Sequence, residues 1–186
     1  MPRIEPVPMD ELPPESRAII EGGVADGLYS TPLPLQVFAY STERLRRLHE
    51  ARLERGSGGL LDARILELIR IRSAQLGECQ PCMQSRKHDS ITDQDVACLL
   101  VPGRETLTEQ ERLAVEFLDR LSADHHALDD AFYRRLGQAF TAAQIVELGF
   151  SCAETMGVHR FLHTLDIFGE TAPAIPFTRA EVDATR

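Results

Sequence analysis

The sequence has no tryptophan and only 6% aromatic residues. None of its apolar runs approaches the roughly 18 residues that a membrane-spanning helix needs, so no membrane partner is expected. Basic residues are in the minority: 20 Lys+Arg against 29 Asp+Glu give a formal net charge of −9 at pH 7. A general nucleic-acid-binding surface needs a basic face, and the composition therefore argues against nucleic acid as a partner.

The N-terminus carries acids and prolines where a signal peptide would carry an apolar stretch, which favours a cytoplasmic location. Four cysteines in a cytoplasmic chain do not indicate a disulfide framework. The length of 186 residues suggests one domain, large enough to bury a core without disulfides or metals.

The sequence shows no convincing strand alternation, dinucleotide fingerprint, phosphate-binding loop or internal repeat. Its apolar residues recur instead at helical spacing. Pairs with the spacing of N-terminal helix caps are Thr92 with Asp95, Thr108 with Glu111, and Thr141 with Gln144. Helices are expected at about 17–23, 35–55, 61–76, 79–88, 93–100, 109–122, 129–136 and 141–168. The sequence therefore predicts an all-α fold of seven or eight helices.

Prolines divide the chain. Residues 1–16 contain five of them and cannot form a continuous helix, because each lacks an amide donor and restricts its predecessor. We interpret residues 1–34 as a proline-rich arm with a short helix, residues 35–170 as the helical domain, and residues 171–186 as a C-terminal tail.

Cys79 and Cys82 form a C-x-x-C pair at a predicted helix start. One helical turn keeps the two sulfurs near disulfide distance, and the free amides and positive end of a helix stabilise a thiolate there. This chemistry favours cycling between dithiol and disulfide. Cys98 and Cys152 stand alone among apolar neighbours, as core cysteines do.

Two other interpretations of the pair stay open. The cysteines could be half of a zinc site, for which the best distant ligands are His159 and His163, spaced i,i+4 on one helix. They could also be two inert buried thiols, since free cysteine is among the most buried residue types.

A longer pattern surrounds the pair: LDARILELIRIR at 61–72, AQLG at 74–77 and CQPC at 79–82. It resembles the carboxymuconolactone decarboxylase superfamily, and more closely its alkylhydroperoxidase D-type (AhpD-like) branch. The signature of that branch is a glutamate twelve residues before C-x-x-C-x-x-x-H, and Glu67 lies twelve before Cys79. Further segments that resemble family members are PPE at 13–15, LQVF at 35–38 and GVHRF at 157–161.

The resemblance implies an alkylhydroperoxidase-like helical bundle that forms a homo-oligomer, a trimer or hexamer. It implies Cys82 as the peroxidatic thiol, Cys79 as the resolving thiol and Glu67 as the distal base. No cofactor or metal is expected. The expected partners are a hydroperoxide substrate and a dithiol protein or small thiol as reductant.

Two positions depart from the signature. Arg86 stands where the histidine is expected, and Pro81 stands where the peroxidase carries a second histidine. Arginine cannot relay a proton, but on a continuing helix Arg86 would reach the thiol region, stabilise a thiolate and pair with Glu67. His88 and His159 are the candidate replacements for the missing histidine.

The sequence thus predicts a thiol-dependent hydroperoxide reductase. One alternative is a non-enzymatic redox sensor or assembly protein that forms the disulfide without turnover. A less favoured one is a lactone decarboxylase in which Arg70, Arg72 and Arg86 bind an acidic substrate.

Overall fold

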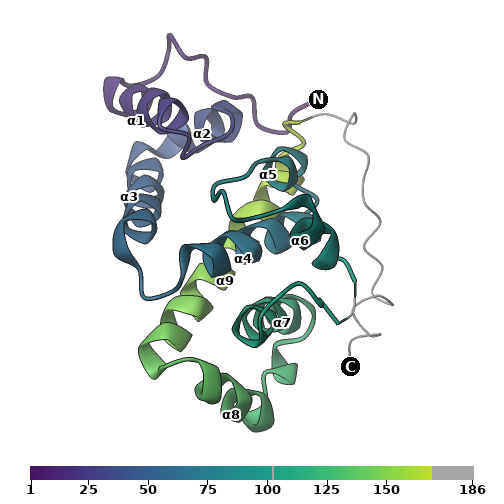
Figure 1. The fold of residues 1–186 in the computed structure, drawn as a ribbon. Helices are drawn as coiled ribbons and strands as arrows, with labels where there is room; N and C mark the ends of the chain where they lie inside the picture. The colour runs from purple at the N-terminus through teal and green to yellow at the C-terminus, as the bar shows by residue number, and fades with distance from the viewer. Residues whose placement is uncertain (102, 169–186) are drawn as a thin grey trace. The chain divides into compact units, whose positions relative to one another are not determined.

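The protein is described here by a computed structural model, which covers residues 1–101 and 103–168. These residues form α-helices and two short 3-10 helices, and no strand occurs among them (Figure 1). The all-α prediction is confirmed for this part of the chain. No helix within it is long and apolar enough to cross a membrane.

The described chain divides into two compact units. The first unit holds residues 1–59 and 161–168, and the second holds residues 60–160. The domain limits expected from the sequence stay predictions, and the tail at 171–186 lies outside the described residues. Helices of the first unit are α1 (Pro14–Ala25), α2 (Leu33–Phe38), the 3-10 helix η1 (Ala39–Ser41) and α3 (Thr42–Gly58).

The second unit carries the C-x-x-C pair. Its helices are α4 (Ala63–Leu76), α5 (Gln80–Gln84), α6 (Asp93–Cys98), α7 (Glu109–Ala123), the 3-10 helix η2 (His125–Ala127) and α8 (Asp130–Ala139). The last helix, α9 (Ala142–Leu165), begins in this unit and ends in the first.

The proline-rich start is non-helical up to Pro13, and α1 begins at Pro14, three residues earlier than expected. Proline suits this first helical position because its missing N–H would have no partner there. The expected end of this helix at about residue 23 is wrong, since α1 continues to Ala25. Gly23 serves packing instead: a Cβ there would collide with the ring of Tyr29.

The single helix expected at 35–55 is divided. The chain leaves α2 through η1 before α3 begins at Thr42. This break brings Leu35, Ala39 and Leu45 into one buried cluster with Ile20 and Tyr29. Apolar periodicity alone could not locate it, because both halves present apolar residues at helical spacing.

In the second unit, α4 packs its apolar face against α7, α8 and α9. The shared core includes Ile65 and Ile69 from α4, Phe117 from α7, Phe132 from α8 and Leu148 from α9. The other edge of α4 contributes to a second cluster with α6 and α7; its members are Leu68, Ile71, Ile91, Cys98, Leu99, Leu107 and Val115. Helix α4 is therefore the central support of the unit, and the cysteine pair follows directly after it.

The capping pairs expected at α6 and α7 are both formed, and Arg64 joins them. Its guanidinium donates to Asp95 (3.0 Å) and to Glu111 (2.7 Å), the carboxylates that cap the two helices. Burial by itself raises the pKa of Asp95, but hydrogen bonds from Arg64 and Thr92 outweigh it and hold that pKa below its ordinary value. The third expected cap is formed too: Thr141 Oγ1 accepts from the Gln144 amide at 3.3 Å.

Candidate functional site

A sharp turn at the end of α4 presents the C-x-x-C pair. Helix α4 ends at Leu76, as expected, with Gly77 as its C-cap residue, and Glu78 follows with a left-handed φ of 53°. The Glu78 amide donates to Gln75 O (3.4 Å), and the Cys79 amide donates to Ala74 O (3.0 Å). These two bonds form a Schellman motif, in which glycine is the usual left-handed residue. Glu78 holds that conformation at a cost of about 1–2 kcal/mol.

The cysteines sit at the two ends of the first turn of α5. Cys79 is the N-cap residue, Pro81 lies within the first turn, and the Cα atoms of Cys79 and Cys82 are 5.3 Å apart. Their sulfurs form a disulfide. Cys79 is 2% exposed, whereas Cys82 is only partly buried. Cys82 is therefore the more exposed residue of the pair.

Helix α5 is shorter than the sequence predicts. It ends at Gln84, and Ser85 already has an extended conformation, so the expected continuation to residue 88 is wrong. A five-residue helix adds little of the dipole field that the longer predicted helix would have supplied to a thiolate. Stabilisation of a thiolate must come from side chains around the pair.

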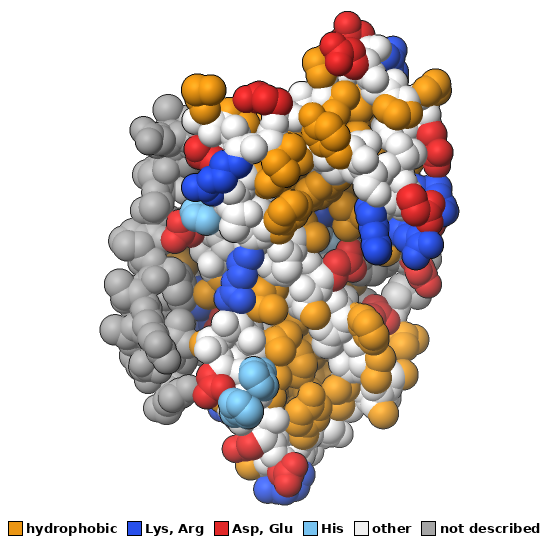
Figure 2. Space-filling view, turned by 180° about the vertical axis from the view of Figure 1, so that it is seen from behind, with side chains coloured by type: hydrophobic (Ala, Val, Ile, Leu, Met, Phe, Trp, Pro, Cys, Tyr) orange, Lys and Arg blue, Asp and Glu red, His pale blue; other side chains and the backbone are white. Residues whose placement is uncertain are grey.

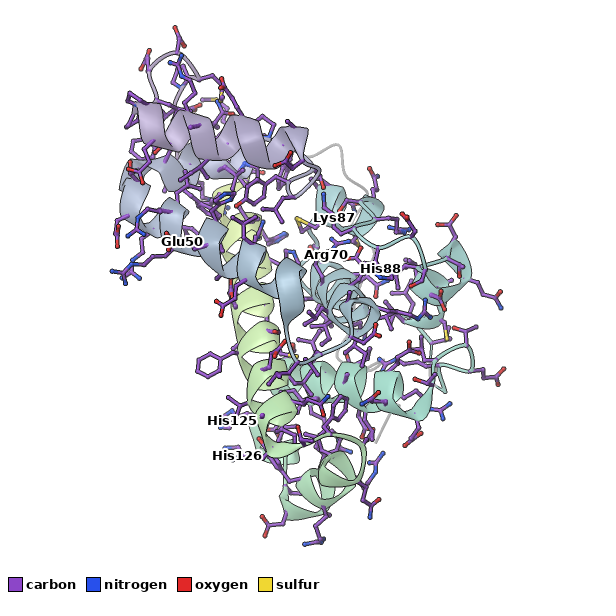
Figure 3. All side chains as sticks on the ribbon, turned by 60° about the vertical axis from the view of Figure 1, so that its left-hand side comes forward. Glu50, Arg70, Lys87, His88, His125 and His126 are labelled. Carbon is purple, nitrogen blue, oxygen red and sulfur yellow. A yellow bond between two sulfur atoms is a disulfide. The ribbon has the colours of Figure 1, made fainter. Side chains whose placement is uncertain are left out.

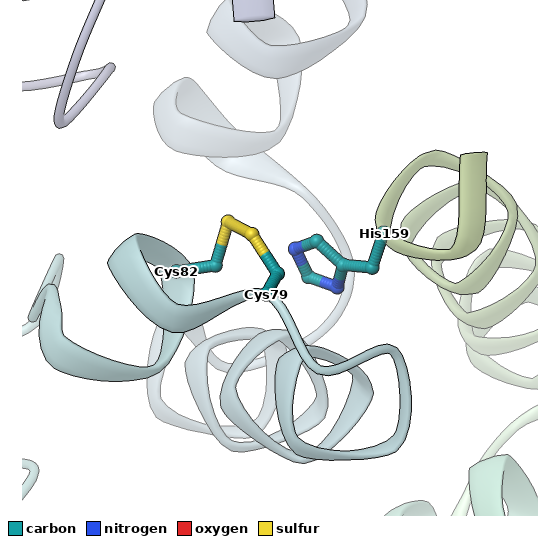
Figure 4. Close-up of side chains that lie close together, drawn as sticks. All are labelled: Cys79, Cys82 and His159. Atoms are coloured by element: carbon teal, nitrogen blue, oxygen red, sulfur yellow. A yellow bond between two sulfur atoms is a disulfide. The ribbon is translucent and has the colours of Figure 1, made fainter. Parts of the chain in front are cut away.

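His159 of α9 is one of those side chains. The two sulfurs and a ring nitrogen of His159 all lie within 4.8 Å of one another. The imidazole is 4% exposed, and its Nδ1 is 2.9 Å from Ser73 Oγ. Figure 4 shows the other edge of the ring, which carries Nε2, directed at the disulfide. The structure thus places one of the two candidate replacement histidines beside the sulfurs.

Gly77 permits this approach. A Cβ at Gly77 would lie 2.8 Å from the Cβ of His159 and 3.2 Å from its carbonyl carbon. The first distance is shorter than real Cβ atoms show and the second is tighter than most Cβ contacts, so any other residue at position 77 would require α9 or the turn to shift. Gly77 therefore both ends α4 and makes space for His159.

Glu67 is buried and is paired with Arg70, one turn further along α4. Arg70 donates to both carboxylate oxygens of Glu67 at 2.7 Å, and the amide of Lys87 donates to the same carboxylate at 2.7 Å. Arg70 also donates to the carbonyls of Cys82 (2.6 Å) and Ser85 (2.7 Å). The pair fastens α5 and the following loop to α4, and Figure 3 shows Arg70 and Lys87 in this region.

The expected pairing of Arg86 with Glu67 is wrong, because Arg70 occupies that carboxylate. Arg86 follows the end of α5 and donates to the carbonyl of Met83 at 2.7 Å. Its ion-pair partner is Asp93, at 3.2 Å. The early end of α5 explains the difference, since the helical phase that would have directed Arg86 toward the thiols no longer applies.

His88, the other candidate replacement histidine, lies in the same loop. Its Nδ1 is 2.7 Å from Ser90 Oγ, and Figure 3 shows it after Lys87, well away from His125 and His126. The group of possible ligand side chains around the sulfurs contains His159 and does not contain His88.

The two remaining cysteines are buried in the core, as expected. Burial raises the pKa of Cys152, and the negative charge of Asp119 raises it further. Its thiol thus stays protonated and unreactive at neutral pH.

The sequence prediction includes neither the pairing of Arg70 with Glu67 nor the contact of Ser73 with His159. Arg70 stands i,i+3 from Glu67, a spacing at which helical side chains meet, so this partner could have been found from the sequence. The contact between Ser73 and His159 joins residues 86 positions apart, and no sequence pattern near either residue indicates it.

No protein-family model, curated protein or solved structure gives a significant match to this chain.

Proposed function

We propose that this protein is a thiol-dependent hydroperoxide reductase of the alkylhydroperoxidase D-like type, cycling Cys79 and Cys82 between dithiol and disulfide. The observation that carries the proposal is the grouping of both sulfurs with the buried imidazole of His159 within 4.8 Å. A thiolate is the reactive nucleophile in such chemistry, and an adjacent imidazole is a suitable proton acceptor for a thiol.

In the proposed reaction, His159 takes the proton of the Cys82 thiol and the thiolate attacks the terminal oxygen of the hydroperoxide. An S–O bond forms, the O–O bond breaks, and the leaving alkoxide takes a proton to become an alcohol. The Cys79 thiolate then attacks the sulfenic sulfur; an S–S bond forms and hydroxide leaves, which becomes water on protonation. A dithiol restores the pair by thiol–disulfide exchange.

The partial exposure of Cys82 supports its role as the attacking sulfur, and the burial of Cys79 supports a resolving role. His159 would replace the histidine that the sequence signature lacks. The contacts of Glu67 favour a positioning role through Arg70, in addition to the distal-base role that the resemblance implies. Arg86, which is paired with Asp93, has no contact that supports a role at the sulfurs.

The test is the oxidation of the reduced protein by an organic hydroperoxide, followed by stopped flow. The second-order rate constant is expected to exceed that of the urea-unfolded chain by at least about tenfold, because one positioned base alone contributes 10²–10⁴-fold. With an excess of a dithiol reductant, hydroperoxide consumption should continue over many turnovers. A rate equal to that of the unfolded chain would contradict the proposal.

The redox-sensor alternative differs from the proposed reductase in that it predicts no catalytic turnover of hydroperoxide. It keeps the oxidant-dependent disulfide but predicts that consumption of hydroperoxide stops after one equivalent, whichever dithiol is supplied. The lactone decarboxylase alternative needs arginines available to an acidic substrate. Arg70 is paired with Glu67 and Arg72 with Asp119 at 2.7 Å, which weakens that alternative.

We also propose that the chain forms a homo-oligomer, the trimer or hexamer that the resemblance implies. Support comes from exposed apolar side chains on α9, where Val146 and Phe150, one turn apart, are 59% and 76% exposed. Figure 2 shows apolar side chains gathered at the surface among charged ones. Exposed apolar patches often mark interfaces between chains.

Sedimentation equilibrium tests this proposal. The wild-type protein should have a multiple of the 20.8 kDa chain mass, and Phe150→Glu should lower it. A monomeric wild type would exclude the oligomer, while a Phe150→Glu protein of unchanged mass would exclude this surface of α9 as its interface.

A further inference from the structure

We infer that the reduced protein binds one Zn²⁺ ion through Cys79 Sγ, Cys82 Sγ and His159 Nε2. The three side chains form one of the two groups of metal-ligand type found in the described part of the chain. The inference goes beyond the proposed function, since it concerns the reduced pair in the absence of peroxide and needs no catalytic turnover.

The spacing of the ligand atoms suits tetrahedral zinc. With Zn–S bonds of about 2.3 Å and a Zn–N bond of about 2.0 Å, the two sulfurs would lie about 3.8 Å apart and each about 3.5 Å from the nitrogen. The corresponding atoms already lie within 4.8 Å of one another. Reduction removes the bond between the sulfurs, and rotation of the two side chains on a backbone with Cα atoms 5.3 Å apart can bring them to zinc-binding separation.

The imidazole is held in the orientation that metal binding requires. A metal-bound histidine typically donates its other ring N–H to a nearby oxygen, which sets the tautomer and the ring angle. Ser73 Oγ, on a side chain that is itself buried, lies 2.9 Å from His159 Nδ1 and can accept that proton. Nε2 then keeps its lone pair on the edge that faces the sulfurs (Figure 4).

The charges favour a soft divalent cation. Two thiolates balance the charge of Zn²⁺ and imidazole is neutral, so the assembled site carries no net charge where it is buried. Thiolate sulfur selects zinc over the hard cations magnesium and calcium. Three protein ligands leave a fourth position for water or an external thiol. The neighbouring charges of Glu67 and Arg70 cancel within their own pair.

Zinc and the disulfide exclude each other. When a hydroperoxide oxidises the zinc-bound pair, the two thiolates lose two electrons, an S–S bond forms and Zn²⁺ is released. The O–O bond breaks, and its two oxygens take up two electrons and two protons to leave as an alcohol and water. Oxidation of the pair therefore releases the ion.

The second group, Asp124 with His125 and His126, is the rival site for the same ion. It has no sulfur ligand, and both of its histidines are exposed. The double variant His125→Ala/His126→Ala is thus the matched control for every measurement.

The experiment titrates the full-length, metal-free, reduced protein with Zn²⁺ in competition with a chromophoric chelator. One Zn²⁺ per chain is expected in the wild type and in the His125→Ala/His126→Ala control, and none at comparable affinity in the disulfide form. His159→Gln and Gly77→Ala are each expected to weaken binding at least about tenfold, the first by removing a ligand and the second by displacing it.

Co²⁺ added to the reduced wild type keeps the inference testable even if these variants fail to fold. Sulfur-to-cobalt charge-transfer bands together with tetrahedral ligand-field bands are expected, and both should vanish when the pair is oxidised. Binding equal in the reduced and oxidised forms, binding lost in the control variant, or cobalt spectra without thiolate bands would overturn the site. Hydroperoxide oxidation of the metal-free protein is measured separately, so a failure of the zinc site leaves the proposed function standing.

Discussion

The fast oxidation of the reduced protein by an organic hydroperoxide is expected to be lost in Cys82→Ser. A serine hydroxyl is not ionised at neutral pH and cannot take the place of the thiolate. The remaining thiol belongs to Cys79, a residue that is only 2% exposed, so it should not support the attack. Stopped-flow measurement of the rate at several hydroperoxide concentrations should show a fall to the rate of the unfolded chain.

The reciprocal variant separates the two roles. Cys79→Ser is expected to react once with hydroperoxide and to stop at a sulfenic acid on Cys82, because no second thiol can condense with it. A sulfenic-acid-selective reagent followed by mass spectrometry locates the product. Cys98→Ser is the control, since its buried thiol lies outside the pair and the rate should not change. Loss of the reaction in Cys79→Ser with retention in Cys82→Ser would reverse the assignment.

The largest effect on stability is expected from Arg70→Ala. The substitution leaves the Glu67 carboxylate, which is 4% exposed, without its cation, and it removes the donor to the carbonyls of Cys82 and Ser85. Removing one partner of a buried ion pair costs about 3–5 kcal/mol, and the partial exposure of Arg70 places the expected loss near the lower end. Urea unfolding gives the free energy of unfolding directly.

Arg86→Ala is the matched control for that measurement. Arg86 also donates to a carbonyl of α5, but its ion-pair partner Asp93 is 99% exposed. An exposed pair of this kind contributes about 1 kcal/mol or less. Adding Glu67→Gln to Arg70→Ala should recover part of the stability by removing the buried charge. Equal losses for Arg70→Ala and Arg86→Ala would mean that Arg70 does not fasten the cysteine turn to α4.

Most of the helices could be predicted from the sequence because their determinants are local. The apolar period of α4, the stop at Gly77 and the cap at Thr108 each depend on residues within one or two turns. The C-x-x-C pair likewise needs only one turn to bring its sulfurs together. Such short-range signals do not depend on the tertiary contacts made by the rest of the chain.

The helix boundaries that were predicted wrongly lie where tertiary packing outweighs the local preference of the chain for helix. Nothing near Gln84 marks the end of α5; the helix ends where Arg70 binds the carbonyls of Cys82 and Ser85 and where Glu67 accepts from the Lys87 amide. The division between α2 and α3 follows from the burial of Leu35 and Leu45 in one cluster. In both places the chain exchanges helical hydrogen bonds for contacts with residues distant in sequence.

By itself the sequence determined that this protein is helical and that two cysteines one turn apart can form a disulfide. Only the tertiary structure decided which side chains surround them: Glu67 pairs with Arg70 rather than Arg86, and His159, 80 residues after Cys79, reaches the sulfurs while His88 does not. The physical reason is that helical periodicity is set by neighbouring residues, whereas the contact of α9 with the turn after α4 depends on a close approach that Gly77 permits.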